Sequence, residues 1–375
     1  MPRENGLERL PENSRSVLQQ LLKDLESRES ITGVGLFGSW SRGDASLSSD
    51  IDLLVVEEKD FDYEYVERAE IDDVFLDLDY IPSKWILRQI PPEIDQKVFE
   101  SQVLLDRKGR FTAAKDIMSK NYWTLERAET RIGNHILQAD TFLSRIVSAL
   151  NREDFQSAKV SAVFGAASVM RVLLEVARKP YSSSRFLRML ESATIRLGVN
   201  DLYGEYLELT GLTRLSRQNA EGILNSVSEM WQQVKRFVQE NSSKTANIHI
   251  NVKNELNYYC KENFLKGLEA RAQTLINESL YEEAVHYLFC ASISMLENYV
   301  WLVSSLEGTR FDFTYLFQKL KNSNLSPKSI YQKTVDAFNL SDISQNEANK
   351  AQQKAKEIVS KLRKKRREFA ETFET

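Results

Sequence analysis

Two aspartates stand at the start of an apolar run near the N-terminus. Asp50 and Asp52 are two positions apart and are followed by Leu53 to Val56, a pattern that predicts a buried strand. Side chains two residues apart on a strand point to the same face, so both carboxylates would lie together. Two carboxylates that close repel each other unless a cation lies between them, and hard oxygen ligands suit Mg²⁺. The pair therefore predicts a divalent metal site.

A Gly-Ser pair lies upstream, at the end of the apolar run Ile31 to Phe37. Gly38 would let the backbone approach a phosphate closely, and the Ser39 hydroxyl with nearby backbone N–H groups could hold its oxygens. Carboxylates beside such a turn suit phosphoryl transfer with two Mg²⁺ ions, or Mn²⁺ in their place. A hydroxyl would attack and pyrophosphate would leave.

A third carboxylate is expected on a neighbouring strand. The run Ile71 to Ile81 carries Asp77 and Asp79, which alternation puts on one face. A buried charge is costly unless a metal or partner compensates it. Asp77 is the deeper of the two in the apolar run, so we expect it to be the third metal ligand. Asp79 is then expected to face the acceptor.

These motifs resemble the signature of the DNA polymerase β-like nucleotidyltransferase superfamily, in particular its minimal and antibiotic-type members. The resemblance covers roughly residues 15–112 and rests on the following segments: Gly38-Ser39 with ten residues before Asp50-Ile51-Asp52, Ser41-Arg42-Gly43-Asp44, Asp77 to Pro82, and Val103 to Gly109. It implies that Asp50, Asp52 and Asp77 are catalytic residues and metal ligands. It also implies that nucleotide is held by Gly38, Ser39, Arg42, Asp50 and Asp52. For Arg42, a surface ion pair is the alternative.

The surrounding elements predict an α+β protein. Strands are expected at 31–37, 51–56, 74–81 and 103–105, with a helix over 16–25. From about Ala113 onward the spacing of apolar residues is helical almost throughout. We expect a small mixed-sheet nucleotidyltransferase domain (1–112) and two all-α bundles (113–240 and 250–375), joined by a linker at 241–249.

The two bundles look like an internal repeat offset by roughly 126 to 128 residues. Phe155 to Ala158 matches Tyr281 to Ala284, and each match precedes a long apolar helix rich in small residues. The second bundle is therefore a possible duplication of the first.

The helical region also suggests partners. In this superfamily a helical domain often helps to hold the acceptor, which makes Glu175 a candidate base and Lys179 or Arg185 candidate phosphate contacts; surface roles are the alternative. The bundles resemble HEPN domains, frequent partners of minimal nucleotidyltransferases. Arg131 and His135 are too close together for the nucleolytic members. We expect non-nucleolytic bundles that could support a homo-oligomer.

Composition narrows the function further. The net charge of −4 argues against a broadly basic nucleic-acid-binding protein, apart from the cluster Lys361 to Arg367. Two cysteines without ligand spacing and three scattered histidines favour neither a disulfide scaffold nor a histidine metal site. The run Val160 to Val176 carries Arg171 and Glu175, so we expect no membrane span and a cytoplasmic protein.

The expected reaction is transfer of a nucleoside monophosphate, AMP from ATP being favoured, to a hydroxyl of a small molecule or a protein. An RNA 3′ end is a third acceptor, supported only by the Lys361 to Arg367 cluster. The alternative is a catalytically inactive nucleotide-binding sensor, or an antitoxin-like interaction protein.

Overall fold

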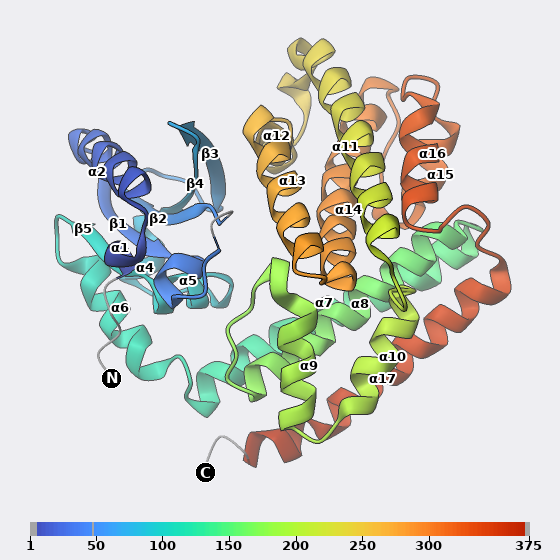
Figure 1. Ribbon diagram of the computed structural model, residues 1–375, viewed down its shortest axis with the longest axis horizontal. Helices are drawn as coiled ribbons and strands as arrows, with labels where there is room; N and C mark the ends of the chain where they lie inside the picture. The colour runs from blue at the N-terminus through green and yellow to red at the C-terminus, as the bar shows by residue number, and fades with distance from the viewer. Residues whose placement is uncertain (1–5, 47–48, 372–375) are drawn as a thin grey trace. The chain divides into compact units, whose positions relative to one another are not determined.

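The computed structural model describes residues 6–46 and 49–371 and divides into two compact units. The first contains residues up to Arg127 together with Lys261–Ala270, and the second contains Ala128–Cys260 together with Arg271 and all that follows. Among the described residues, Figure 1 shows strands only in the first unit and helices throughout the second. The predicted α+β class is therefore confirmed.

A five-stranded mixed sheet forms the centre of the first unit (Figure 1), in the order β3-β4-β2-β1-β5. The parallel pair is β2 with β4, and the other three pairings are antiparallel. The strands span the following residues: β1 Ile31–Phe37, β2 Ile51–Glu57, β3 Tyr65–Ile71, β4 Val74–Pro82 and β5 Gln102–Asp106.

Alternation along the central strands separates two apolar layers. Leu53 and Val55 of β2 join the core that includes helix α2 (Glu12–Ser27), whereas Leu54 and Val56 join the core of α5 (Asp95–Glu100) and α6 (Arg110–Asn121). Within β1, Gly35 makes room for α6, since a Cβ there would lie 2.8 Å from the Phe111 ring. Asp52, by alternation, shares the α5 face with Leu54.

Strand β3 was not predicted from the sequence. This strand forms a hairpin with β4 through Asp72 and Asp73, both with positive φ (49° and 61°), as a tight two-residue turn requires. The two turn-forming residues Asp72 and Asp73, directly before a predicted strand, were the available signal. Its register pairs Arg68 with Asp77, which matters for the site below.

The second unit is all-helical. More than half of the residues in each of its long helices α8 and α14 are buried, as expected for core helices. The helices assigned to it wholly or in part are α7 Leu125–Asn151, α8 Phe155–Val176, α9 Phe186–Arg196, α10 Asn200–Thr210, α11 Arg217–Glu240, α12 Ile250–Tyr259, α13 Glu262–Asn277, α14 Tyr281–Leu306, α15 Leu316–Asn322, α16 Lys328–Ala337 and α17 Gln345–Glu371.

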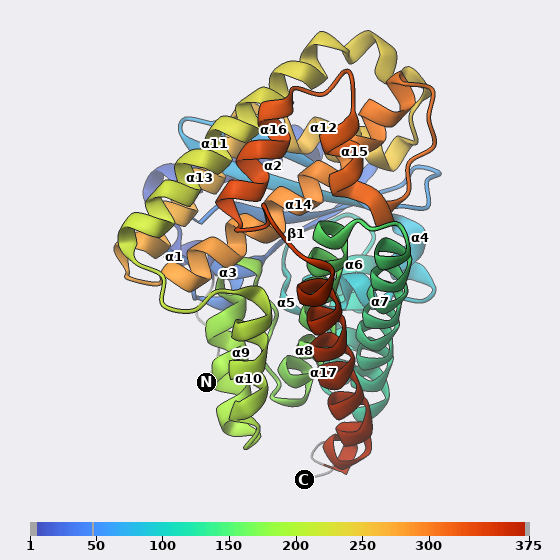
Figure 2. The same cartoon turned by 90° about the vertical axis from the view of Figure 1, so that its right-hand side faces the viewer.

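The helical unit has two halves, one within residues 113–240 and the other within 250–375, and the last helix of each half packs against the other half. Helix α17, from the second half, packs against α8 and α10 of the first half, and α11 of the first half packs against α14 and α16 of the second. Figure 2 shows α17 beside α8, and α11 beside α16. The predicted division into bundles 113–240 and 250–375 stays a prediction, but the apolar faces of both halves are buried in one compact unit.

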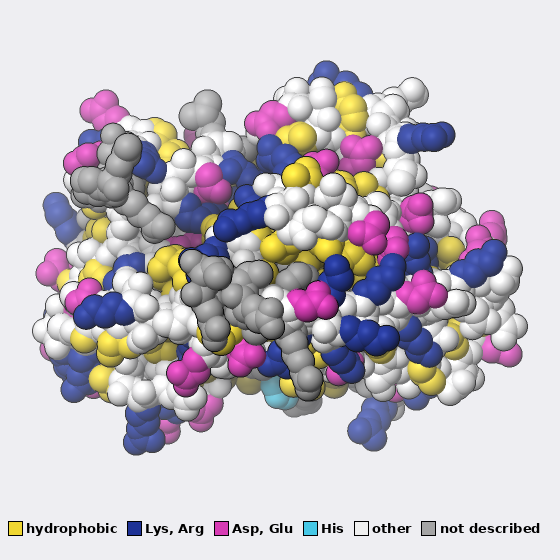
Figure 3. Space-filling view, turned by 90° about the horizontal axis from the view of Figure 1, so that it is seen from below, with side chains coloured by type: hydrophobic (Ala, Val, Ile, Leu, Met, Phe, Trp, Pro, Cys, Tyr) yellow, Lys and Arg dark blue, Asp and Glu magenta, His cyan; other side chains and the backbone are white. Residues whose placement is uncertain are grey.

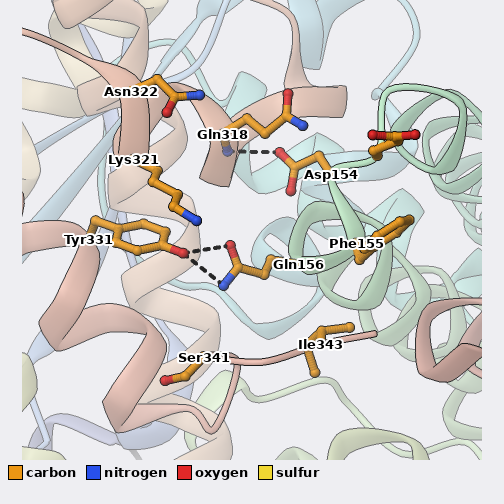
Figure 4. Close-up of a pocket in the computed structure, with 10 residues that line it drawn as sticks. Asp154, Phe155, Gln156, Gln318, Lys321, Asn322, Tyr331, Ser341 and Ile343 are labelled. Atoms are coloured by element: carbon orange, nitrogen blue, oxygen red, sulfur yellow. Dashed lines mark hydrogen bonds between the residues drawn. The ribbon is translucent and has the colours of Figure 1, made fainter. Parts of the chain in front are cut away.

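Polar contacts of one kind, a carboxylate with a helix N-terminus, join the halves in both directions. In Figure 4 the Asp154 carboxylate accepts a hydrogen bond from the Gln318 backbone N–H (2.9 Å) at the start of α15. Glu283, at the start of α14, accepts hydrogen bonds from the N–H groups of Leu187 (2.8 Å) and Arg188 (2.9 Å) in α9. Both carboxylates therefore cap the first turn of a helix of the other half, and the duplication stays a prediction.

One helix among the described residues is long and apolar enough to cross a membrane, judged by length and composition. It is α8, and 78% of its apolar window is buried inside the helical unit. A core helix of a folded domain gives the same signal.

Candidate active site

Three carboxylates converge at one end of the sheet. Asp50 directly precedes β2, Asp52 is the second residue of β2, and Asp77 is its register partner in the parallel strand β4. One oxygen from each lies within 4.8 Å of the others. Asp50 and Asp77 are only 8% and 7% exposed. The same-face placement expected from the sequence is thus present, and a third carboxylate joins it from the next strand.

Gly38 makes the position of Asp52 possible. Its φ of +74° is one that only glycine adopts readily, and a Cβ there would lie 2.1 Å from Asp52 Oδ2. Gly38 begins the short helix α3 (Gly38–Arg42), which also contains Ser39. The Gly-Ser turn therefore lies against the acidic group, where its predicted role in nucleotide binding requires it.

A cation from the protein itself bridges two of the carboxylates. Arg68 Nη1 donates to Asp77 Oδ2 at 2.7 Å and to Asp50 Oδ2 at 3.1 Å. All three side chains are buried, so the ion pairs are little screened by water. Arg68 was not among the predicted site residues. It comes from β3, whose register places it opposite Asp77.

The carboxylate of Glu100 meets the predicted phosphate contacts. Glu100 Oε2 accepts hydrogen bonds from the Gly38 N–H (3.2 Å) and from Arg42 Nη1 (2.7 Å). Burial raises the pKa of Glu100, and the Arg42 guanidinium opposes that rise. Arg42 also pairs with Asp44 at 3.3 Å. Arg42 thus forms ion pairs, although its partner Glu100 is buried and not at the surface as the alternative had it; its contact with nucleotide stays a prediction.

Asp79 has a different environment from Asp77. It pairs with the Lys97 ammonium of α5, which also pairs with Glu64. Although burial lowers the pKa of Lys97, the two carboxylates raise it above its ordinary value. Lys97 therefore stays charged and neutralises Asp79. Of the two candidates for third ligand, Asp77 is the one grouped with Asp50 and Asp52.

The remaining candidates belong to the helical unit. Arg131 donates two hydrogen bonds to Glu175 Oε2 (3.0 and 2.8 Å), and His135 Nε2 lies 3.6 Å from Oε1. Burial raises the pKa of Glu175, but the hydrogen bonds from His135 and Arg131 outweigh it and hold the pKa below its ordinary value. Such a carboxylate is a weak base. Lys179 lies in the loop after α8 and Arg185 ends the short 3-10 helix Ser183–Arg185 that follows it; their contacts with phosphate stay predictions.

The C-terminal basic cluster is partly neutralised within the helical unit. Lys361 pairs with Glu205 at 2.6 Å, and Arg363 pairs with Asp140. The side chain of Arg367 lies outside the described residues. Positive and negative side chains are interspersed over the face drawn in Figure 3. These pairs weaken the case for an RNA-binding strip.

The residues at the acidic group fit a divalent cation. Three hard oxygen donors converge, a guanidinium already lies between two of them, and Gly38 lacks the Cβ that would fill the space beside Asp52. Sequence reasoning missed Arg68, Lys97 and Glu100. For Arg68 the signal was the β3–β4 hairpin. The contacts of Lys97 with Asp79 and of Glu100 with helix α3 join residues far apart in the sequence, and no local pattern shows them.

Comparison with known proteins agrees with this geometry. Residues 18–115 match the family model described as "Nucleotidyltransferase domain". No curated protein matches the chain. A solved structure, a nucleotidyltransferase-like protein from Exiguobacterium sibiricum, matches with 12% identity over 87% of this chain and 88% of that one. Its TM-score of 0.33 is too low to support an argument about fold or function.

The family match ends well before the helical unit, so the HEPN resemblance of that unit stays a prediction. The match does contain the Gly-Ser turn, Asp50, Asp52 and Asp77. The N-terminal region of this chain is therefore a nucleotidyltransferase domain of the DNA polymerase β-like kind, followed by a large all-helical region.

Proposed function

We propose that this protein is a Mg²⁺-dependent nucleotidyltransferase that transfers AMP from ATP to a hydroxyl group. The observation that carries the proposal is the group Asp50, Asp52 and Asp77, with oxygens within 4.8 Å of one another inside a matched nucleotidyltransferase domain. Buried carboxylates this close need positive charge between them. Arg68 brings one such charge to two of the three carboxylates, and a metal complex of a nucleoside triphosphate would bring the rest.

In the proposed reaction an acceptor hydroxyl oxygen forms a bond to the α-phosphorus of ATP. The bond from that phosphorus to the oxygen bridging it to the β-phosphate breaks, and pyrophosphate leaves with the electron pair. Divalent ions held by Asp50, Asp52 and Asp77 would neutralise the charge on the phosphate oxygens and favour ionisation of the hydroxyl. Asp77 is our candidate to receive the hydroxyl proton.

The Gly-Ser turn would position the triphosphate. The Gly38 N–H and the Arg42 guanidinium both donate to one carboxylate oxygen of Glu100, and this supports the proposal that they can serve as a donor pair for another anion. A phosphate oxygen offers the same kind of acceptor. Glu100 would then have to give way to it.

We propose a small molecule or a protein as the acceptor. The ion pairs of Lys361 with Glu205 and of Arg363 with Asp140 leave less positive charge for an RNA backbone. The Glu175 carboxylate, paired with Arg131, contributes poorly as a base. We also propose a cytosolic location, since Cys260 and Cys290 are free thiols.

One observation favours a second function. Arg68 lies on two of the three carboxylates, as expected of a member that keeps its fold but has replaced metal chemistry with an internal ion pair. Such a protein would bind nucleotide as a sensor and transfer nothing.

The decisive experiment is incorporation of label from α-³²P-labelled ATP into small-molecule, protein and RNA acceptors with Mg²⁺. The full chain is compared with Asp50→Asn/Asp52→Asn and with Asp24→Asn, an exposed carboxylate of α2 that pairs with Arg28. Transfer by the full chain and Asp24→Asn, lost in the double variant, supports the enzyme. Calorimetric binding of Mg²⁺-ATP without transfer supports the sensor. Equal binding by the parent and a folded double variant contradicts both.

A further inference from the structure

We propose that Arg68 is the resident cation of the acidic site and that a divalent metal enters by exchange for its guanidinium. The proposal rests on the proposed function and assigns a role to a residue outside the predicted ligand set. The same nitrogen, Nη1, contacts Asp77 Oδ2 at 2.7 Å and Asp50 Oδ2 at 3.1 Å. It therefore lies where one positive charge serves two carboxylates.

The guanidinium and a metal cannot use these oxygens together. Mg²⁺ binds carboxylate oxygens at about 2.0–2.1 Å in near-octahedral geometry. An ion between Asp50 and Asp77 would be in steric conflict with Nη1, and its charge would repel the arginine. The two cations are alternatives. The metal must displace Arg68 from Asp50 and Asp77. The free energy of these arginine contacts therefore reduces the apparent binding free energy of the metal.

The surroundings of Arg68 give its guanidinium a place to go. Its charged end lies over two aromatic rings, 5.3 Å from the centre of Phe75 in β4 and 5.6 Å from that of Phe264 in α13. Phe264 belongs to the same compact unit as the sheet. Aromatic faces attract a cation, so a shift away from the carboxylates leaves Arg68 with favourable contacts. Moving the guanidinium onto the aromatic rings therefore costs less free energy than moving it into an apolar core without such contacts.

Residues of the segment 261–270 contact Arg68 and leave space for its side chain. The Lys261 ammonium donates to the Arg68 carbonyl oxygen at 2.7 Å, which fixes the backbone. At Gly267 a Cβ would lie 2.3 Å from Arg68 Nη2, so the absence of a side chain leaves room for the guanidinium. These contacts fix the backbone of β3 at Arg68, while the side chain keeps room beside it.

Mn²⁺ binding tests the exchange. Free Mn²⁺ is measured by electron paramagnetic resonance during titration of the full chain, of Arg68→Gln, and of Arg127→Gln. Arg127 makes an ion pair with the fully buried Asp95 in the same unit and serves as the matched control. Removing one partner of a buried pair leaves a charge that a metal can neutralise, so we expect Arg68→Gln to bind Mn²⁺ at least about tenfold more tightly. Arg127→Gln should bind as the parent does.

Each outcome bears on the proposal. Unchanged or weaker Mn²⁺ binding by folded Arg68→Gln overturns it and makes Arg68 a structural residue. If Arg68→Gln folds only with Mn²⁺, the metal has replaced the arginine, which supports the proposal. If it folds in neither condition, Arg68→Lys is used; parent-like affinity in that variant overturns the exchange. If Asp50→Asn/Asp52→Asn binds Mn²⁺ as tightly as the parent, the metal site of the proposed function is wrong.

Discussion

The two units of this protein keep buried carboxylates in two different ways. In the nucleotidyltransferase unit, Asp50 and Asp77 are held by a side-chain cation, Arg68. In the helical unit, Asp154 and Glu283 are held by backbone N–H groups at the starts of α15 and α9. Burial raises the pKa of both Asp154 and Glu283, and the N–H donors oppose that rise.

The two kinds of partner differ in whether a metal ion can replace them. A backbone N–H at a helix terminus cannot move away without loss of the helix end, so a carboxylate bound there is committed to structure. An arginine side chain can adopt another rotamer and leave its partner open to a metal. Asp50 and Asp77 can therefore be freed for a metal without loss of a helix end, whereas Asp154 and Glu283 cannot.

The largest expected effect is on the rate of transfer. Asp77→Asn should lower it at least a hundredfold, about 3 kcal/mol of transition-state stabilisation, because a ligand of the metal is lost. Asp79→Asn, which disturbs the pair with Lys97, should lower thermal stability and leave the rate within severalfold. Steady-state kinetics on both variants measures this. Loss of turnover in Asp79→Asn with a near-normal Asp77→Asn would reverse the assignment.

Gly38→Ala tests whether the site depends on the close approach of Asp52. The positive φ costs about 1 kcal/mol for alanine, and the Cβ must push Asp52 away, so Mn²⁺ affinity should fall by about tenfold. Gly109→Ala is the control, because Gly109 also has positive φ (+65°), but a Cβ added there would meet no atom within 4 Å. It should lose a similar amount of stability and keep its Mn²⁺ affinity. Equal metal binding by both variants contradicts the role of Gly38.

Glu283→Gln probes a carboxylate held by the backbone. The amide keeps the volume but weakens the two hydrogen bonds from Leu187 and Arg188, so unfolding free energy should fall by about 1–2 kcal/mol. Chemical denaturation measures the loss. Mn²⁺ affinity should not change. A shift in metal affinity would mean that the two kinds of carboxylate are coupled.

The smallest effect concerns Glu297 in α14, which pairs with Arg145 at 3.4 Å. Burial raises its pKa to about 7, against an ordinary value of 4.5. Between these values the folded chain binds a proton that the unfolded chain has released, so stability falls as the pH rises from 4.5 to 7. Glu297→Gln should reduce that fall by up to about 1 kcal/mol. Thermal melts across this range, with the exposed Glu221→Gln as control, decide it; identical pH profiles count against the assignment.

The sequence predicted those parts of the site that depend on alternation along one strand. Strand β1 has the expected bounds, β2 and β4 each extend one residue further, and Asp50, Asp52 and Asp77 meet as their spacing indicated. Arg68 could not be placed because β3 was not recognised, and the partner of a buried charge depends on strand register. Helical periodicity likewise shows which face of a helix is apolar but not which helix covers it. The exchange of α11 and α17 was therefore out of reach.

The place of Lys261 in the chain affects how the protein is made. Its ammonium binds the carbonyl of Arg68, 193 residues earlier. At about 5–20 residues per second, a ribosome needs roughly 10–40 s to synthesise the intervening chain. During that interval the strands carrying Asp50 and Asp77 can pair, while the segment that borders Arg68 does not yet exist. In a nascent chain Arg68 can therefore already lie beside Asp77, but it gains its contacts with Lys261, Phe264 and Gly267 only when the segment 261–270 has been made.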